Sequence, residues 1–420
     1  MTADTPGPPR DPAGPARPDP ARPVGPARPC PARPGGGASP GPPGRTGAAR
    51  PARPGAADPA RDAGAGPAQG GAAGTARGVA VVVDGPGAYR LVPHEPVPPG
   101  PGEALVRVHA CGICGSDREV LRGTRPADYV RYPLVPGHEW SGTVEAVGPG
   151  VPARLVGRRT VGEGFRNCQV CARCHAGETT LCTAGYDETG FTRPGALAPT
   201  LTLPARLLHP LPDDADLSAA ALLEPAACVA AAVLAADVRP GERVAVVGTG
   251  TLGLLAVQFL AASSPAALLA VDLREDRADR AHRCGATRLC TRDELHGPHG
   301  LRPGAPDGFD VVVETAGSAT AARESAALLR RGGRLVLAGI PAPGATGLDP
   351  TDLVVRQIQV RTVFGAPPAA WAHAVRAFAA GLLDPGPLID RELPLADFGR
   401  VVAPDDAGVA APAGKVLLRP

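Results

Sequence analysis

A glycine-rich turn, Gly248-Thr-Gly-Thr-Leu-Gly253, constrains the fold of this chain more than any other feature of its sequence. It follows the apolar segment Arg243–Val247, which has the pattern of a strand, and precedes Leu254–Phe259, which has the pattern of a helix. A G-x-G-x-x-G pattern alone is weak evidence, but between a strand and a helix it is typical of a βαβ unit that binds a dinucleotide pyrophosphate. The predicted cofactor contacts in this turn are Gly248, Gly250, Leu252 and Gly253.

An acidic residue after the next predicted strand, Leu268–Val271, is the second part of the dinucleotide signal. Asp272 follows Gly253 by about 20 residues, where a carboxylate can accept hydrogen bonds from the adenosine ribose hydroxyls. The same carboxylate repels a 2′-phosphate, so the sequence favours NAD. Arg274 and Arg277 could moderate that repulsion, which leaves NADP as the alternative, and Arg277 is a further predicted cofactor contact.

The chain divides into two halves with different strand patterns. Up to about residue 215, short strands such as Val79–Val83, Ala104–His109 and Ser141–Val147 alternate with Gly and Pro turns. Beyond that point, Ala- and Leu-rich helices alternate with apolar strands, which include Phe309–Val313 and Arg334–Ala338. Such alternation predicts βαβ units on a parallel sheet, so the predicted fold class is α/β plus β.

Four cysteines, Cys168, Cys171, Cys174 and Cys182, have the spacing of a structural zinc site. Thiolates this close in sequence can close a tetrahedral shell around Zn²⁺ and leave no position open for a substrate. His175 lies beside them, but four cysteines suffice. We therefore predict a structural zinc ion here, rather than a redox pair or a chance cluster.

Two patches that are separated in sequence carry the residue types of a catalytic metal site. Cys111-Gly-Ile-Cys-Gly-Ser-Asp117 and Pro136-Gly-His-Glu-Trp140 place a thiolate, an imidazole and carboxylates in glycine-rich turns. With three protein ligands and one exchangeable position, zinc becomes a catalyst that polarises an oxygen. Asp117 would accept the free N–H of the ligand histidine. Glu224 either reaches the metal or serves as an acid at the start of a helix.

Composition excludes several other classes of protein. The chain has 43 Lys and Arg against 41 Asp and Glu, without the basic excess that nucleic-acid binding leaves. No apolar run is long enough for a membrane span, and no secretory signal pattern is present. Ten cysteines without such a signal indicate metal ligands or thiols and a cytoplasmic location. We expect neither nucleic acid nor a membrane as a partner.

Residues 1–78 differ from the rest of the chain. They contain 19 Pro, 16 Gly and 19 Ala, and Val24 is their only residue of the Leu, Ile, Val and Phe set. Such a segment cannot bury enough apolar surface to offset its ordering entropy. We predict a disordered tail, or a translation start that lies near Val79.

A catalytic zinc beside a nicotinamide is typical of the reversible oxidation of an alcohol to a carbonyl. At the motifs above and at the closing Gly414-Lys-Val-Leu-Leu418, the chain resembles the zinc-containing medium-chain dehydrogenase/reductase family. The resemblance implies a GroES-like catalytic domain over 79–225, a Rossmann domain with a doubly wound parallel sheet over 226–365, and a segment over 366–420 that completes the first domain. It also implies two zinc ions per chain, NAD or NADP, and a homodimer or homotetramer.

The resemblance assigns roles to the metal-site residues. Cys114, His138 and Glu139 match the catalytic-zinc positions, and Cys111 matches a neighbouring cysteine that does not bind the metal. Glu224 matches a carboxylate at or near the metal in polyol- and threonine-dehydrogenase-like members. Members specialised on simple primary alcohols have a cysteine there, so the resemblance favours secondary alcohols.

The resemblance also suggests a route for the substrate proton. Ser116 matches the hydroxyl that takes this proton, and Asp117 supports the ligand histidine. Glu119 stands where many members have the histidine that ends the relay. Loops 118–132 and 364–371 are expected to contribute to the substrate pocket.

A narrower resemblance connects residues 137–142, 186–195 and 224–228 to the aminocyclitol dehydrogenases of aminoglycoside antibiotic biosynthesis. It implies a small polyhydroxylated substrate, 2-deoxy-scyllo-inosamine, oxidised at a ring hydroxyl. The alternative is a catabolic sugar, polyol or threonine-like zinc dehydrogenase. A non-enzyme alternative is an NAD-binding redox sensor, but a sensor has no need of an open metal site.

Overall fold

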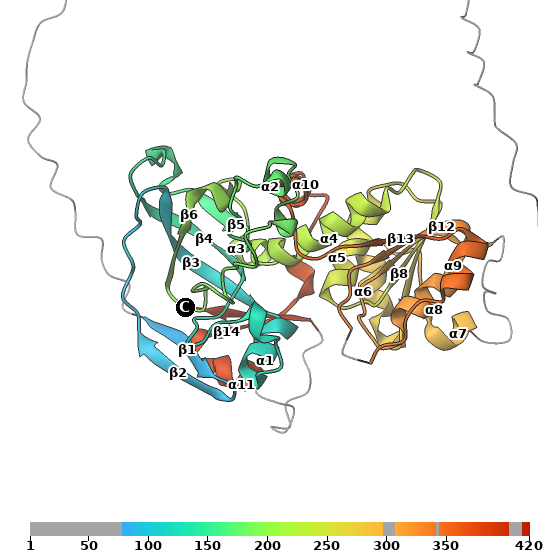
Figure 1. The fold of residues 1–420 in the computed structure, drawn as a ribbon, viewed down its shortest axis with the longest axis horizontal. Helices are drawn as coiled ribbons and strands as arrows, with labels where there is room; N and C mark the ends of the chain where they lie inside the picture. Colours follow the sequence, from blue (N-terminus) through green and yellow to red (C-terminus); the bar gives the residue numbers. More distant parts are fainter. Residues whose placement is uncertain (1–77, 297–306, 342–343, 403–413) are drawn as a thin grey trace, which may run out of the picture. The chain divides into compact units, whose positions relative to one another are not determined.

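The computed structural model describes residues 78–296, 307–341, 344–402 and 414–420 (Figure 1). The predicted tail lies outside these ranges except for its last residue, Gly78. The described residues contain a two-stranded hairpin, a seven-stranded sheet and a six-stranded sheet. A β half is followed by a parallel α/β half, which confirms the predicted fold class.

The seven-stranded sheet holds most of the first half and is completed by the end of the chain. Its strands lie in the order β14-β15-β3-β4-β5-β7, and β6 also pairs with β3. The strands are β3 (Glu103–Ile113), β4 (Glu139–Val147), β5 (Arg159–Gly162), β6 (Thr200–Pro204), β7 (Leu208–Pro210), β14 (Ile389–Pro394) and β15 (Lys415–Arg419). The hairpin is β1 (Val79–Gly85) and β2 (Ala88–Pro93).

The six-stranded sheet is parallel throughout. Its order is β10-β9-β8-β11-β12-β13. The strands are β8 (Arg243–Val247), β9 (Ala267–Asp272), β10 (Arg288–Thr291), β11 (Phe309–Glu314), β12 (Leu329–Leu337) and β13 (Gln359–Thr362). Successive strands are therefore added on one side of β8, as β9 and β10, and then on its other side, as β11, β12 and β13. Doubly wound folds bind their ligands at such a change of side, beyond the carboxyl ends of the strands.

The helices have the following bounds. The α-helices are α1 (Gly115–Arg122), α2 (Ala172–His175), α3 (Leu217–Ala220), α4 (Leu223–Ala236), α5 (Thr251–Ala261), α6 (Ala278–Arg283), α7 (Arg292–His296), α8 (Ala321–Leu328), α9 (Pro350–Arg356), α10 (Pro368–Ala379) and α11 (Phe398–Val402). Short 3₁₀ turns are η1 (Ala127–Tyr129), η2 (Ala153–Leu155), η3 (Thr179–Leu181), η4 (Ala205–Leu207), η5 (Glu275–Arg277), η6 (Gly386–Leu388) and η7 (Leu395–Asp397). Within the described ranges, every helix is too short or too polar to cross a membrane.

Helix α4 packs deep in the core and begins at the candidate site. Its Ala- and Leu-rich sequence is buried on nearly all sides, as in a helix between other elements. The same core contains Leu211 from the first half, Val244 and Val311 from the parallel sheet, and Trp371 from α10. The predicted domain boundary at residue 225 falls inside this helix, and the predicted boundaries remain proposals.

Candidate active site

Two turns at the ends of neighbouring strands bring Cys114 and His138 together. β3 ends at Ile113 and β4 begins at Glu139, and their antiparallel register pairs Gly112 with Glu139. The residues just beyond these strand ends must therefore meet, although they are separated in the sequence. Cys114 Sγ lies 3.2 Å from His138 Nε2.

The turn before His138 requires glycine. Gly137 has a φ of +100°, which other residues rarely adopt. A Cβ at this position would lie 2.8 Å from both Cys111 Sγ and the backbone nitrogen of Leu197. A larger residue would displace the turn, and the imidazole would move with it.

Asp117 supports both ligand-bearing turns. Its Oδ2 accepts a hydrogen bond from the Cys114 N–H at 2.9 Å and so helps to cap helix α1. Its Oδ1 lies 3.7 Å from His138 Nδ1, and neither of these two buried atoms has a hydrogen-bond partner. The carboxylate thus lies behind the imidazole, on the side predicted from the sequence.

The surroundings of His138 stabilise positive charge. Burial alone lowers the pKa of His138, but the Cys114 sulfur and the Asp117 carboxylate raise it, and the net shift is upward. A buried pocket that favours a cation between sulfur and carboxylate fits a divalent metal ion. Cys114, His138 and Glu139 also form one of two groups of described residues whose ligand atoms all lie within 4.8 Å of one another.

Lys415 already holds the carboxylate of Glu139. Its Nζ lies 2.7 Å from Oε1 and 2.6 Å from Oε2, and it donates to the Ile113 carbonyl at 3.2 Å. Both charged side chains are buried. Strand β15 places the lysine there because it pairs with β3, with Val416 opposite Ile113. No role was predicted for this residue from the sequence, although the only lysine of the chain, placed in the closing motif, is a usable signal.

Glu224 approaches the site from the first turn of α4. Cys228, one turn later, donates to Glu224 Oε1 at 3.5 Å. Burial raises the pKa of Glu224 to about 7, which His138 opposes and Glu139 reinforces. Glu224 does not belong to the three-residue ligand group, so a direct metal contact stays a prediction.

Glu188 is a buried carboxylate that the sequence did not reveal. The Tyr186 hydroxyl donates to it, and Arg125 Nη2 donates to that hydroxyl at 2.9 Å. Burial raises the pKa of Glu188, and His138 partly opposes that shift. The Arg125 guanidinium lies 3.8 Å from the centre of the Phe191 ring, which is 4.7 Å from the His138 ring. These contacts connect Glu188 to the metal-binding pair.

The two residues predicted for the proton relay have different surroundings. The Ser116 N–H donates to Cys114 Sγ at 3.2 Å, which places Ser116 beside the ligand group. Glu119 has a side chain that is 51% exposed, and its Oε2 lies 3.6 Å from Arg125 Nη1. The Glu119 carboxylate is therefore accessible to solvent. The relay itself stays a prediction.

Aromatic side chains are rare in this chain, yet several gather near the site. Aromatic residues make up 3% of the sequence. Tyr129 packs 4.8 Å from Tyr186 and 6.4 Å from Phe364, and Phe165 lies 5.8 and 6.0 Å from the same two rings. Both loops that were predicted to contribute to the substrate pocket supply a ring to this cluster.

The four cysteines of the predicted structural site form the second ligand group. Cys168 Sγ lies 3.9 Å from Cys174 Sγ, and Cys182 Sγ accepts from the Cys168 N–H. Backbone N–H groups of Thr183 and Cys174 lower the pKa of Cys171 to about 5. Burial and the neighbouring Cys171 thiol raise the pKa of Cys174 to about 12, so the four sulfurs do not ionise alike without a metal. Four sulfurs that converge within one loop fit a closed zinc site.

The glycine turn after β8 has the shape that a dinucleotide needs. Gly248 has a φ of +92°, and a Cβ at Gly253 would lie 1.7 Å from the Gly248 carbonyl oxygen. A Cβ at Gly250 would meet nothing within 4 Å, which leaves open space before helix α5. No side chain caps this helix, so its first N–H groups can bind phosphate oxygens. Leu252 lies in the first turn, partly buried against the core.

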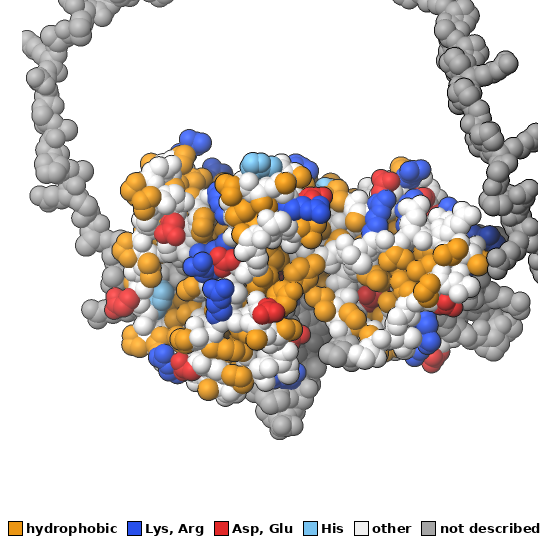
Figure 2. All heavy atoms as spheres, in the orientation of Figure 1, with side chains coloured by type: hydrophobic (Ala, Val, Ile, Leu, Met, Phe, Trp, Pro, Cys, Tyr) orange, Lys and Arg blue, Asp and Glu red, His pale blue; other side chains and the backbone are white. Residues whose placement is uncertain are grey.

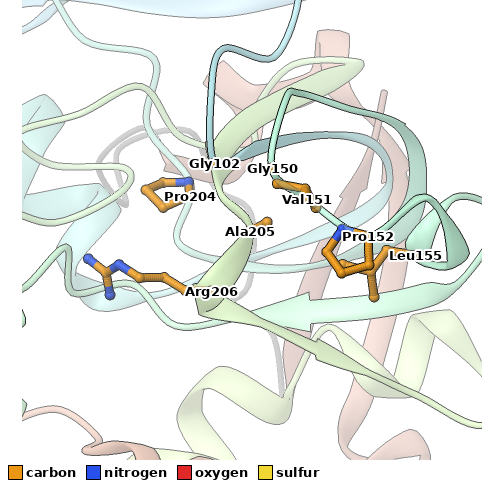
Figure 3. Close-up of a pocket in the computed structure, with 8 residues that line it drawn as sticks. All are labelled: Gly102, Gly150, Val151, Pro152, Leu155, Pro204, Ala205 and Arg206. Carbon is orange, nitrogen blue, oxygen red and sulfur yellow. The ribbon is translucent and has the colours of Figure 1, made fainter.

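A cavity elsewhere in the described part of the chain has a lining of different chemistry. A cavity of about 510 Å³ is bordered by Gly102, Gly150, Pro204 and Arg206 (Figure 3), and its lining has no metal-ligating cluster. On the face shown in Figure 2, basic side chains are scattered among acidic and apolar ones. That face presents no single basic patch to a polyanion.

Two family models match the chain. The alcohol dehydrogenase GroES-like domain matches residues 100–213, and the zinc-binding dehydrogenase model matches residues 251–380. The first range contains Cys114, His138 and the four-cysteine group. The second contains Asp272 and most of the parallel sheet.

Individual proteins match over most of their length. An L-threonine 3-dehydrogenase from Deinococcus deserti is 31% identical over 76% of this chain and 92% of its own. A thermostable alcohol dehydrogenase from Pyrobaculum aerophilum is 32% identical, with a TM-score of 0.72 over 81% of this chain and 99% of that one. A structure from Sinorhizobium meliloti 1021, described as a zinc-binding dehydrogenase bound to NADP, is 31% identical, with a TM-score of 0.73 over 81% and 99%.

Proposed function

The chain belongs to the zinc-containing medium-chain dehydrogenase/reductase family, and from that premise we propose that it oxidises a secondary hydroxyl of a small polar alcohol. It is a zinc-dependent NAD(P) oxidoreductase, and zinc with NAD or NADP are the cofactors typical of its relatives. The observation that carries the substrate proposal is the set of carboxylates, Glu224 and Glu188, beside the Cys114–His138 pair.

The residues of the site have different proposed roles. Cys114 and His138, with Glu139 or Glu224, would hold the catalytic zinc, and Cys168, Cys171, Cys174 and Cys182 the structural one. When bound, the catalytic zinc would supply a Lewis acid for the hydroxyl oxygen, and the nicotinamide would supply a hydride acceptor. Asp117 orients the imidazole, and Ser116 receives the hydroxyl proton and passes it toward Glu119 and solvent.

The carboxylates favour a substrate with more than one polar group. Burial raises the pKa of both carboxyls, so each accepts hydrogen bonds from hydroxyl or ammonium groups when it is ionised and can donate one to a hydroxyl when it is protonated. Glu224 accepts a hydrogen bond from the Cys228 thiol, a weak donor, and a substrate hydroxyl or ammonium group would be a stronger partner. Glu188 would offer the substrate a polar contact, and the aromatic cluster an apolar one. Small-molecule sites usually combine the two.

The relatives named L-threonine 3-dehydrogenase favour the catabolic alternative, a sugar, polyol or threonine-like zinc dehydrogenase. These matches do not support the narrower aminocyclitol hypothesis or a place in antibiotic biosynthesis. We propose that the substrate is an amino alcohol such as threonine, or a polyol. The aminocyclitol belongs to the same broad class and is included in the assay. A cytoplasmic location and a homodimer or homotetramer joined through the open edge at β13 are also proposed.

A substrate panel tests this function directly. The purified, zinc-loaded protein is mixed with NAD⁺ or NADP⁺ and with L-threonine, sugar alcohols, an aminocyclitol or ethanol, and absorbance of the reduced cofactor is followed. We expect at least one amino alcohol or polyol to exceed ethanol in kcat/KM by about 100-fold, because a site that pairs hydroxyl groups rejects analogues without them. Faster turnover of ethanol than of every other compound would contradict the proposal.

Substitution Glu224→Gln tests the role of this carboxylate. The amide keeps the size of the side chain but removes its charge and half of its acceptor capacity. We expect kcat/KM for the preferred polyhydroxylated substrate to fall about tenfold or more, while ethanol changes less. Equal effects on both substrates would show that Glu224 acts on the metal or the fold, and an unchanged rate would remove it from the site.

A further inference from the structure

Arg125 is a nearly buried arginine that has no role in the proposed chemistry. Its side chain is 11% exposed, and it lies between α1 and the turn η1. Nε donates to the Tyr129 carbonyl at 3.0 Å, and Nη2 donates to the Tyr186 hydroxyl at 2.9 Å. Nη1 lies 3.6 Å from Glu119 Oε2, which is beyond hydrogen-bond distance. An ion pair this long, with a half-exposed partner, contributes little, so other contacts must hold the guanidinium in place.

The guanidinium lies over the Phe191 ring. Its central carbon is 3.8 Å from the ring centre, well within the roughly 6 Å at which an aromatic face attracts a cation. The same ring is 4.7 Å from the His138 ring, with 40° between the two planes. Phe191 is 2% exposed and His138 5%. Protein interiors are close-packed, so a ring that the guanidinium holds in place restricts the rotation of the imidazole that it contacts.

His138 depends on this packing because the polar contact behind its ring is long. A metal-binding imidazole is usually oriented by a hydrogen bond from its second ring nitrogen. Here Nδ1 of His138 lies 3.7 Å from Asp117 Oδ1, which is too long for such a bond. Contact with Phe191 therefore adds a restraint that the contact with Asp117 does not give.

The contacts of Arg125 require an arginine. Its planar fork donates to Tyr129 and Tyr186 while its face covers Phe191. A lysine would keep the charge, but its single nitrogen at the end of a flexible chain could not make all three contacts.

The groups that accept these hydrogen bonds are themselves held in place. Tyr129 and Tyr186 belong to the aromatic cluster, which also contains Phe165 and Phe364. Gly365 has a φ of +68°, and a Cβ there would lie 2.3 Å from Cε2 of Phe165, so the segment after β13 packs directly on this ring. The arginine thus links the ring at the metal site to a cluster built by segments just after β5 and β13.

We propose that Arg125 is a positioning residue of the candidate active site, which holds Phe191 against the His138 ring and so fixes the direction in which the imidazole meets the metal. The inference rests on the proposed function, since it concerns the metal site of the same enzyme. Arg125 acts through Phe191, so it is neither a metal ligand nor a carrier of the substrate proton. Its loss should weaken the hold on the metal and misplace it, while the dinucleotide turn stays intact.

Zinc release from the loaded protein tests this proposal. Release to a colour-forming chelator should have two phases, and the phase that Cys114→Ala lacks belongs to the catalytic site. We expect this phase to become about tenfold faster in Arg125→Met, because residues behind a metal ligand commonly contribute tenfold or more to metal affinity. The value of kcat should also fall about tenfold, and the Kd of NADH should stay within about twofold of the wild type.

Two further substitutions separate the position of the guanidinium from its charge. Arg125→Lys should release zinc as fast as Arg125→Met, since it keeps only the charge. Phe191→Leu should also accelerate release. The double variant with Arg125→Met and Phe191→Leu should add little to either single one, because both remove the same contact.

Arg158→Met is the matched control. Arg158 donates to the Leu211 carbonyl at 3.1 Å and lies 3.3 Å from Asp213 Oδ1, so the same substitution again removes an arginine with a carbonyl and a carboxylate as partners. We expect zinc release and kcat to equal those of the wild type.

Wild-type zinc release in Arg125→Met or in Arg125→Lys overturns the inference, as do additive effects in the double variant, and the dehydrogenase function stands if the alcohols are still oxidised. If thermal melting shows that Arg125→Met does not fold, Arg125→Lys and Phe191→Leu decide the question. A wild type that oxidises no alcohol but whose variants show the expected zinc release overturns the proposed function and leaves the inference standing.

Discussion

Replacing Cys114 by alanine is expected to remove turnover and leave the fold intact. The sulfur lies 3.2 Å from His138 Nε2, and its loss deprives the proposed catalytic metal of its only thiolate. We expect kcat to fall by about three orders of magnitude or more, since Lewis-acid assistance disappears with the metal. The same sulfur caps helix α1 through the Ser116 N–H, so the stability cost is limited to about 1 kcal/mol.

Three measurements together separate this outcome from unfolding. Steady-state kinetics report the loss of turnover, thermal melting reports the fold, and metal analysis should show one zinc ion per chain in place of two. Cys290→Ala, which removes a buried thiol in strand β10 away from the site, serves as the control and should keep its activity. A Cys114→Ala protein with wild-type kcat, or with both zinc ions, would remove this cysteine from the catalytic centre.

Replacing Cys171 by serine is expected to lower the stability of the protein more than its turnover, the reverse of the effect of Cys114→Ala. The lobe that carries the four cysteines contains only the short turns α2 and η3, and most of its side chains are exposed. With little apolar burial, the lobe depends on the metal, whose binding energy in a closed site becomes folding energy. We expect the melting temperature to fall by more than about 5 °C.

Limited proteolysis locates the effect of this second substitution. Cleavage between residues 167 and 183 should become faster in Cys171→Ser, while the parallel sheet remains protected. His175→Ala is the control, because this exposed residue lies in the same turn and belongs to neither ligand group. An unchanged melting temperature together with two zinc ions per chain would show that the lobe needs only three of its cysteines.

Features that depend on neighbours in sequence could be predicted from the sequence. The turn at Gly248–Gly253 joins a strand to a helix within a few residues, and strand β8 has the predicted bounds Arg243–Val247. The four cysteines likewise meet because their spacing lets a single loop turn them inward. In both cases the residues that form the feature lie within one short segment, so the motif itself contains nearly all of its contacts.

The convergence of Cys114 and His138 was inferred from residue types, but its cause is the register of two strands. β3 and β4 pair so that one strand's end meets the other's beginning. The sequence shows that a thiolate and an imidazole lie in glycine-rich turns. It does not show which turns meet, because that depends on a pairing stabilised by the whole sheet.

Partners of the charged groups were decided by the tertiary structure alone. Lys415 reaches Glu139 across 276 positions because β15 joins β3, and Arg125, 61 positions before Tyr186, donates to the tyrosine hydroxyl that in turn donates to Glu188. Sequence by itself determined the fold class, the four-cysteine group and the dinucleotide turn, since each depends on short-range spacing and residue chemistry. Tertiary structure decided which charges are paired, buried or free, because those properties arise from contacts between segments distant in the chain.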